Sequence, residues 1–421
     1  MSARLSKIFM TRGKAAAQPP WVIVAGGFHA GGAMDRANAA LARHLRDLGV
    51  PLHLVSYQFD ADIGDSPAIA TYRVKRPVNS AMLGKWSLER TAWTVAARVM
   101  ARTAGARVVV NGGNCIWPDI NWVHYIHRAS QFWDEGAPLW FKTKNRIGCL
   151  IDRRRELLAL RNARVVLANS DRTRADLISL LGLEPQRVHT VYLGAEPSWM
   201  PADANRRLAA RAWLGKPARR PLVAFIGALG YDNRKGFDRL MTAWRRLCAR
   251  PEWDADLIAA GGGRALASWR REVAEAGLGE RVTMLGFTSR VTDLLAAADL
   301  LVSPVRYEAY GVNVQEALCA GVPAMVTRAT GIAERYPAEL SDLLLDRDDA
   351  DSLAARLLRW RADMNGFRNR AAPLGRLLRS QTLGDMAAQI VAIVESTPPS
   401  ASMKNLGRRM PQWLSGHQRA S

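Results

Sequence analysis

Two glutamates, Glu308 and Glu316, are the residues of this sequence whose spacing points most directly to chemistry. Seven residues separate them, and Gly311 lies between them. A carboxylate on a loop can accept hydrogen bonds from sugar hydroxyls, and a second one in a following helix can take a ribose diol. The positive end of that helix favours a phosphate group nearby. The arrangement therefore suits a ligand that carries both sugars and phosphate.

The sequence around this pair predicts a strand, a loop and a helix. The apolar run from Leu300 to Val302 ends in a Ser-Pro turn, which is typical of a buried strand. Glu316 begins a helical stretch that Gly321 and Pro323 end. In an open parallel sheet, ligands bind just beyond the carboxyl ends of the strands. The alternative interpretation is a pair of solvated helix charges that share this spacing by chance.

A turn over residues 228–236 carries a second set of candidate binding residues. It follows a predicted strand over 221–227 and precedes a predicted helix. Arg234 and Lys235 supply two adjacent positive charges, and Gly236 lets the backbone approach a ligand. These features predict a diphosphate site, with a solvated turn charge as the alternative for Arg234.

Another glycine-rich turn lies near the start of the chain. The apolar run over 21–25 predicts the first strand, and a helix is predicted from about Met34 to Leu48. The turn between them contains Gly31 and Gly32, but its glycines match neither the dinucleotide-binding pattern nor the P-loop pattern. These glycines either let the backbone approach a diphosphate or form a tight turn with no ligand.

Two histidines, His124 and His127, lie beyond a predicted strand at residues 107–110. Two histidines at this spacing can bind a metal ion, but no third ligand is suitably spaced, so no metal site is predicted. The alternative for either histidine is a purely structural role, in which the side chain is packed and hydrogen-bonded.

The composition limits the partners that the protein can have. The chain has 421 residues, enough for two domains, and a net charge of +21 that favours nucleic acid, anionic lipid or a phosphorylated substrate. No apolar run is long enough to span a membrane. The four cysteines are far apart, which predicts reduced thiols in a cytoplasmic protein rather than disulfides.

A basic stretch over residues 142–164 alternates cations with apolar residues at roughly helical spacing. One interpretation is an amphipathic helix with a solvated charged face. The other is a surface helix attracted to anionic lipid headgroups. No RNA-binding signature is present, so no nucleic-acid partner is expected.

The motifs around Glu308 and Glu316 carry a family resemblance. The segments Arg-Tyr-Glu-Ala-Tyr-Gly and Glu-Ala-Leu-Cys-Ala-Gly-Val-Pro resemble the signature of the family 4 retaining glycosyltransferases of the GT-B fold. The resemblance implies an α/β protein in which two Rossmann-like, doubly wound parallel-sheet domains face each other across a cleft. It also implies transfer of a sugar from a UDP- or GDP-sugar to a glycan or lipid-linked acceptor, with no metal or other cofactor.

The resemblance assigns roles to individual residues. His127 is expected beside the donor sugar, with His124 as the second choice. Glu308 would hold the sugar hydroxyls, and Lys235 and Arg234 would stabilise the departing diphosphate. The further donor-binding residues are Gly31, Gly32, Gly227, Gly236, Gly286, Tyr310, Gly311, Val312 and Glu316. The sequence departs from the family pattern at Ala228, where an arginine is usual, and Arg234 is the predicted substitute.

The predicted organisation follows from the alternation of strands and helices together with this resemblance. It comprises a basic arm (1–20), an N-terminal acceptor domain (21–200), a C-terminal nucleotide-sugar domain (201–380), a helix that crosses back (381–395) and a basic tail (396–421).

Two other functions remain open on the sequence alone. One is a different GT-B sugar enzyme, such as an epimerase or a phosphorylase. The other is a non-catalytic basic protein that binds polyanions, with strongly salt-dependent affinity. For the transferase, the basic segments suggest an anionic or lipid-linked acceptor and contact with the inner face of the cytoplasmic membrane.

Overall fold

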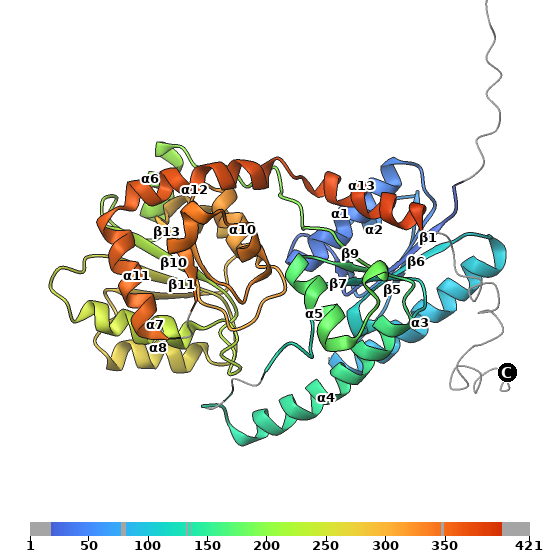
Figure 1. Ribbon diagram of the computed structural model, residues 1–421, viewed down its shortest axis with the longest axis horizontal. Coiled ribbons are helices and arrows are strands. Elements are labelled where there is room, and N and C mark those ends of the chain that lie inside the picture. The colour runs from blue at the N-terminus through green and yellow to red at the C-terminus, as the bar shows by residue number, and fades with distance from the viewer. Residues whose placement is uncertain (1–17, 77–80, 132–133, 135, 347–348, 398–421) are drawn as a thin grey trace, which may run out of the picture.

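The computed structural model describes residues 18–76, 81–131, 134, 136–346 and 349–397. The chain forms two units that lie side by side, and each is built on a parallel sheet covered by helices (Figure 1). The predicted basic arm and basic tail fall almost entirely outside the described residues.

The first unit contains a seven-stranded parallel sheet in the order β5-β3-β1-β6-β7-β8-β9. Its strands are β1 (Trp21–Val24), β3 (Leu52–Ser56), β5 (Ile69–Arg73), β6 (Arg107–Asn111), β7 (Ile120–Val123), β8 (Val165–Ala168) and β9 (Val188–Thr190). A small separate pair joins β2 (Gly27–Phe28) to β4 (Gln58–Phe59). The helices are α1 (Ala33–Asp47), α2 (Ala61–Gly64), α3 (Ala81–Arg102), α4 (Leu139–Asn162) and α5 (Asp171–Leu181).

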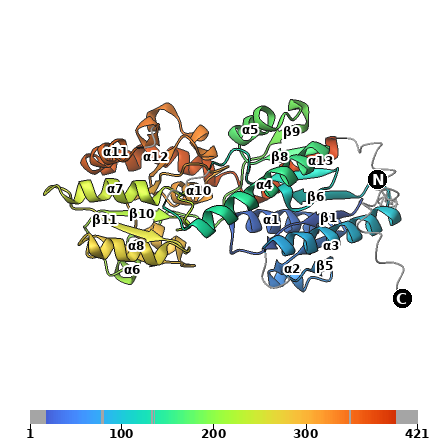
Figure 2. The ribbon, with the colours of Figure 1, turned by 90° about the horizontal axis from the view of Figure 1, so that it is seen from below.

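Strand β1 shows why this sheet needs helices on both faces. Trp21 and Ile23 pack into one core cluster, whereas Val22 and Val24 pack into another. Successive side chains of a strand point to opposite faces, so a continuous apolar run fills the cores on both sides. Figure 2 shows helices above and below the strands.

The second unit contains a six-stranded parallel sheet in the order β12-β11-β10-β13-β14-β15. Its strands are β10 (Leu222–Ile226), β11 (Asp256–Ala260), β12 (Val282–Gly286), β13 (Leu300–Ser303), β14 (Ala324–Thr327) and β15 (Leu344–Leu345). The helices are α6 (Ala204–Trp213), α7 (Phe237–Cys248), α8 (Leu266–Glu275), α9 (Val291–Ala297), α10 (Val312–Cys319), α11 (Ala350–Ala362) and α12 (Met364–Arg379). The predicted fold class, two Rossmann-like parallel-sheet domains, is confirmed.

The last helix returns to the first unit. Helix α13 (Leu383–Ser396) follows α12 and packs against α1 (Figure 1). Backbone hydrogen bonds from Ala195 N to Gln381 O (2.8 Å) and from Leu383 N to Ala195 O (3.2 Å) join the crossing segment to the chain that leaves the first unit. The two units are thus connected twice. None of the helices that the structure describes combines the length and apolarity of a membrane span.

The helix after the signature loop begins earlier than predicted. Helix α10 starts at Val312, one turn before Glu316, because Gly311 at its N-cap has a left-handed backbone (φ 104°) that ends the preceding loop. Glu316 therefore lies in the second turn of α10, with its side chain largely buried.

Candidate active site

A cavity of about 1270 Å³ lies between the two units, at the carboxyl ends of strands from both sheets. Segments far apart in the sequence line it, including the turn after β1, the turn after β10 and the loop between β13 and α10. The predicted site residues that line it are Gly31, Gly32, His124, His127, Gly227, Arg234, Lys235, Glu308, Tyr310, Gly311, Val312 and Glu316. This location is where parallel sheets bind ligands.

Two predicted donor-binding glycines do not line this cavity. Gly236 has a left-handed backbone (φ 72°) at the start of α7, and a Cβ atom there would lie 1.8 Å from the carbonyl oxygen of Pro304. Gly286 also has a positive φ, of 80°, at the end of β12. Glycine is needed at these positions because of the backbone conformation and, at Gly236, because of close packing. Neither glycine lies on the cavity wall.

Glu308 and the two cations of the β10–α7 turn meet inside the cavity. The carboxylate of Glu308 pairs with the ammonium of Lys235, and Nη1 of Arg234 lies 3.3 Å from the same oxygen. Burial alone would raise the pKa of Glu308, but the charges of Lys235 and Arg234 outweigh it and lower that pKa. The cluster thus holds an ionised carboxylate beside two cations.

The loop that carries Glu308 is attached to its neighbour through the backbone. Glu308 N donates to Ala329 O (3.3 Å), and Gly331 N donates to Glu308 O (3.1 Å). A Cβ atom on Gly311 would lie 2.5 Å from Cγ2 of Thr330, so only glycine fits there. These contacts fix the direction in which the loop presents its carboxylate.

Arg306 joins this loop to the turn that holds the cations. Its guanidinium makes two hydrogen bonds to the carboxylate of Asp238 (2.6 and 2.7 Å) and one to Asn233 O (2.6 Å). Its backbone N–H donates to Arg234 O (2.8 Å). Arg306 thereby sets the position of Arg234 and Lys235 relative to Glu308.

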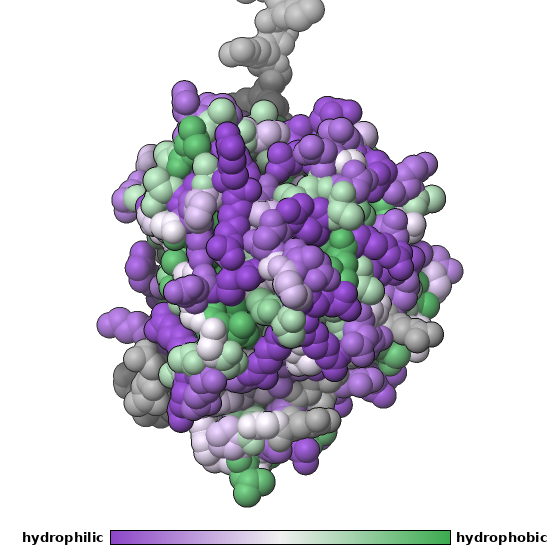
Figure 3. Space-filling model, turned by 90° about the vertical axis from the view of Figure 1, so that its left-hand side faces the viewer, coloured by the Kyte–Doolittle hydropathy of each residue, from purple (hydrophilic) through white to green (hydrophobic). Residues whose placement is uncertain are grey.

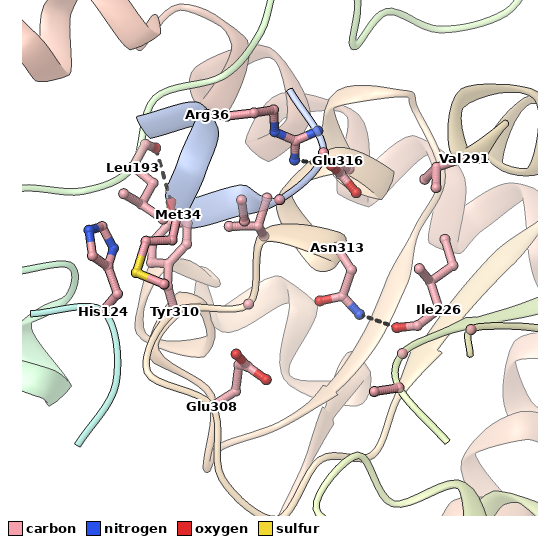
Figure 4. A pocket seen from close by; sticks show the side chains of 18 of the residues that line it. Met34, Arg36, His124, Leu193, Ile226, Val291, Glu308, Tyr310, Asn313 and Glu316 are labelled. Carbon is pink, nitrogen blue, oxygen red and sulfur yellow. Dashed lines mark hydrogen bonds and ion pairs between the residues drawn. The ribbon is translucent and has the colours of Figure 1, made fainter. Parts of the chain in front are cut away.

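Glu316 is paired with a residue that sequence reasoning missed. Nη2 of Arg36, from α1 of the other unit, lies 2.6 Å from its carboxylate (Figure 4), and Nε of Arg36 lies 3.1 Å from Glu196. Burial raises the pKa of Glu316 although Arg36 opposes the shift. The available signal was the place of Arg36 in the first turn of the helix after the glycine-rich segment.

Asn313 is a second residue that the sequence analysis did not single out. Its side-chain Nδ2 donates to Ile226 O at 2.9 Å (Figure 4), which connects the start of α10 to the end of β10. It lies between the two glutamates in the signature, so a position-by-position reading of that segment could have found it.

The two histidines occupy different surroundings. His124 lines the cavity near the end of β7, and its Nε2 atom is buried without a hydrogen-bond partner among the residues that the structure describes. Burial lowers the pKa of His124 to about 3, so its imidazole is neutral. His127 packs edge-on against Tyr125, and burial lowers its pKa as well, with Asp152 opposing the shift.

Comparison with known families follows the same division into two units. The model described as "Glycosyltransferase Family 4" matches residues 34–199, and the model described as "Glycosyl transferases group 1" matches residues 220–363. Together they cover most of both units. The chain belongs to the group 1, family 4 glycosyltransferases. The family resemblance predicted from the signature is therefore confirmed.

Several curated glycosyltransferases are similar to part of this sequence. The chain is 26% identical to the alpha-D-kanosaminyltransferase of Streptomyces kanamyceticus, over 60% of this chain and 67% of the relative. It is also 26% identical to the lipopolysaccharide core biosynthesis mannosyltransferase LpsB of Rhizobium meliloti, over 56% of this chain and 67% of the relative. A D-inositol 3-phosphate glycosyltransferase of Mycobacterium sp. is 31% identical, over 45% of this chain and 43% of the relative.

Solved structures of glycosyltransferases share the fold over nearly the whole chain. WaaG, a glycosyltransferase involved in lipopolysaccharide biosynthesis, superposes with a TM-score of 0.65 at 20% identity, covering 89% of this chain and 99% of the other. The sucrose-phosphate synthase of Thermosynechococcus elongatus gives a TM-score of 0.68 at 20% identity, covering 90% and 99%. Anabaena HepE in complex with UDP-glucose gives 0.64 at 18% identity, covering 90% and 99%.

Proposed function

We propose that this glycosyltransferase moves a sugar from a UDP- or GDP-sugar to a glycan or lipid-linked acceptor with retention of anomeric configuration. The observation that carries the proposal is the cluster of Glu308 with Lys235 and Arg234, in the same cavity as Glu316. A diphosphate needs cations to balance its charge, and the hydroxyls of two sugar rings need hydrogen-bond acceptors. The complex of Anabaena HepE with UDP-glucose supports this class of donor.

In the proposed reaction, the bond between the anomeric carbon and the phosphate oxygen breaks as the acceptor oxygen bonds to that carbon. The proton of the acceptor hydroxyl passes to an oxygen of the departing diphosphate. Lys235, Arg234 and the N-terminus of α10 would stabilise the negative charge that develops there, without a metal ion. Arg234 would thereby replace the arginine that is usual in the family at the position of Ala228.

The glutamates would bind the two sugars of the donor. Glu308 would accept hydrogen bonds from the transferred sugar, and Glu316 would accept them from the ribose. Because Arg36 pairs with Glu316 in this structure, the ribose must share that carboxylate with the guanidinium or displace it.

For the histidine beside the donor sugar, the structure gives His124 more support than His127. Nε2 of His124 is buried without a hydrogen-bond partner among the described residues, and a turn of the ring toward the cavity that His124 lines would let this nitrogen bond to a sugar hydroxyl. We expect His124→Ala to lower kcat more than His127→Ala, measured with the same donor and acceptor. Equal turnover in wild type and His124→Ala would contradict this choice.

The decisive experiment is thermal unfolding in the presence of UDP, GDP, ADP and TDP. A ligand at about 100 times its Kd stabilises the folded protein by about 2.7 kcal/mol, which raises Tm measurably. We expect a shift with UDP or GDP that Lys235→Ala and Glu316→Ala abolish. Lys75→Ala and Glu275→Ala, exposed residues that do not line the cavity, serve as matched controls.

The nucleotide-dependent shift, its dependence on salt and an analysis of the products together separate the rival functions. A polyanion-binding protein would show no nucleotide-dependent shift and would lose its ligands steeply with salt. An epimerase would change the donor without an acceptor, and a phosphorylase would require inorganic phosphate. Either product pattern would overturn the transferase proposal even if the nucleotide binds.

We also propose that α4 contacts an anionic membrane surface. Six large apolar side chains of this helix are exposed, among them Leu139 at 80% and Leu150 at 63%. They lie within about a third of the helix circumference when residues are placed at 100° intervals. The six are Leu139, Trp140, Ile147, Leu150, Ile151 and Leu158, and we call them the α4 stripe.

Charge and position favour a lipid surface for this stripe. By the same placement, the exposed cations Arg154 and Arg161 lie within the sector of the stripe and Lys144 lies just beside it, and each would add about 1 kcal/mol of attraction to anionic lipid. Figure 3 shows an otherwise mainly hydrophilic end of the molecule with hydrophobic surface at its lower tip, where α4 begins in Figure 1.

Sedimentation with phosphatidylglycerol and phosphatidylcholine vesicles tests this surface. We expect binding to the anionic vesicles that the combined Ile147→Ser and Ile151→Ser substitutions weaken at least about tenfold. Leu180→Ser, on an exposed apolar residue of α5, is the control. Protein that remains in the supernatant with both vesicle types would contradict the proposal.

A further inference from the structure

A second cavity of about 590 Å³ adjoins the first one beside the N-terminal part of α4. Tyr125, His127 and Arg234 line both cavities, so the two spaces lie side by side and share these side chains as a common wall. The second cavity has no residue in common with the signature segment that carries Glu308 and Glu316. Its walls come instead from the segment after β7, from α4 and from turns of the second unit.

The outer wall of this cavity is aromatic and joins the two units. Phe141 lies edge-on to Tyr231, with ring centroids 5.5 Å apart. The guanidinium of Arg264 lies over the ring of Trp140, 5.3 Å from its centroid. Trp140 is still 52% exposed, so part of its ring remains open to a ligand.

Polar groups complete the lining and give it hydrogen-bonding capacity. Asn145 and Asp152 project from the α4 side, and Asp232 comes from the second unit. Asp152 is held by an ion pair with Lys85 at 2.6 Å, which leaves its other carboxylate oxygen available as an acceptor. Ser130, Gln131, Lys144 and Arg264 add further polar groups, so the lining combines aromatic rings with many hydrogen-bonding groups. This combination suits a pyranose, whose C–H groups pack on aromatic rings and whose hydroxyls need hydrogen-bond partners.

The cavity and the α4 stripe occupy adjoining faces of one helix. The residues of α4 that line the cavity are at positions 140, 141, 144, 145, 148, 149 and 152, which recur at helical spacing and lie on one side of the helix. The α4 stripe lies on the adjacent face of the helix, and Trp140 belongs both to the stripe and to the lining of the cavity. A molecule that entered the cavity along α4 would therefore pass over exposed apolar side chains.

We infer that the second cavity binds the acceptor, as the sugar headgroup of an amphiphile whose apolar part lies along the α4 stripe. This inference rests on the proposed transferase function. It assigns the acceptor to the space beside His127 and Arg234, where a hydroxyl would face the donor cavity. It also specifies the class of acceptor, since a free oligosaccharide would gain nothing from the stripe.

Photo-crosslinking tests the site without relying on turnover. The probe is an octyl glucoside that carries a diazirine on its alkyl chain, used at saturating UDP or GDP to fill the donor cavity. We expect labelled peptides within residues 139–152, and we expect methyl glucoside or methyl mannoside to compete with the label. Trp140→Ala should lower labelling at least about fivefold, whereas Trp86→Ala, an exposed tryptophan that lines neither cavity, should not.

Three outcomes would overturn the inference. These are labels confined to residues 226–236 and 303–316, no label above background, or labels on α4 that the methyl glycosides do not reduce. The last result would mean apolar adsorption without sugar recognition. The nucleotide-induced rise in Tm is measured in parallel on wild type and on Trp140→Ala, and it should persist in both. If wild type shows that rise but carries no label on residues 139–152, the acceptor inference falls and the donor proposal stands.

Discussion

Burial raises the pKa of both glutamates of the cavity, but the net shifts have opposite directions because their neighbouring cations differ. Lys235 and Arg234 keep the pKa of Glu308 low, whereas Arg36 opposes but does not cancel the effect of burial on Glu316, whose pKa is raised. An ionised Glu308 is ready to accept hydrogen bonds from sugar hydroxyls and balances the cations until a diphosphate arrives. In the absence of a ligand, the glutamates and the cations of the cavity therefore pair with one another.

His124 gives a pH prediction at the same scale. Its pKa is about 3 in the folded protein and 6.5 ordinarily, so the unfolded chain binds more protons between these values. The contribution of His124 to the free energy of unfolding is complete above about pH 6.5 and declines as pH falls below it. We expect urea denaturation to show a steeper loss of stability between about pH 7 and about pH 5 for wild type than for His124→Asn.

His44→Asn, a histidine of α1 outside the cavity, is the control and should keep the wild-type dependence on pH. Identical slopes for wild type and His124→Asn would show that the imidazole of His124 accepts a proton without difficulty, and the buried-neutral interpretation would fail.

At the scale of elements, the site depends on how three loops hold one another. The β13–α10 loop is bonded to the loop after β14 through Glu308 and Gly331, and Arg306 bonds it to the β10–α7 turn. Each loop follows the carboxyl end of a neighbouring strand of one sheet, since β13 lies between β10 and β14. The sheet order therefore brings together segments about 70 residues apart.

Arg306→Met tests this arrangement. It removes three hydrogen bonds and leaves the Asp238 carboxylate without this partner, so we expect a loss of about 1–3 kcal/mol in the free energy of unfolding. The nucleotide-induced shift in Tm should also shrink, because the turn that carries Lys235 is released.

Arg245→Met is the matched control on the same helix as Asp238. Its ion pair with Glu272 is exposed on both sides, and such pairs contribute less than about 1 kcal/mol. If the two variants lost equal stability and bound nucleotide equally well, Arg306 would have no special role in positioning the cations.

At the scale of the whole molecule, a carboxylate from the second unit caps a helix of the first. Oxygens of Glu334 accept hydrogen bonds from the backbone N–H groups of Asp171 and Arg172 at the start of α5, both at 2.8 Å. The hydroxyl of Tyr192 lies 2.7 Å from the same carboxylate. Together with the crossing of α13, this contact fixes the relative orientation of the two units.

Glu334→Ala should loosen that orientation. We expect a loss of about 0.5–1.5 kcal/mol in the free energy of unfolding, from unsatisfied helix N–H groups in an exposed setting. Small-angle X-ray scattering should show a larger radius of gyration for the variant, and UDP or GDP should reduce the difference. Glu339→Ala, on an exposed residue of the same segment, should match wild type in both measurements. An unchanged radius would mean that the crossing of α13 and the other contacts between the units, such as the Arg36–Glu316 pair, hold this orientation without Glu334.

The sequence by itself determined the fold class and most of the local geometry of the site. Apolar runs ending in glycine-rich or Ser-Pro turns predicted the strands, and ligand-binding residues at the ends of parallel strands followed from that. Glu308, Lys235 and Arg234 were found this way and do meet in the cavity, because each lies in a loop that follows a strand of one sheet. Such features are local in sequence, so local patterns reveal them.

The tertiary structure alone decided which side chains face one another. Gly236 and Gly286 satisfy backbone requirements off the cavity wall, while Arg36 reaches Glu316 across 280 residues of sequence. The tertiary structure also showed that α4 exposes an apolar stripe and borders a second cavity. The periodicity of residues 142–164 had left two interpretations open, a solvated charged face and a surface attracted to lipid. These outcomes depend on how the two units dock, and docking is set by surfaces whose residues are scattered along the whole chain.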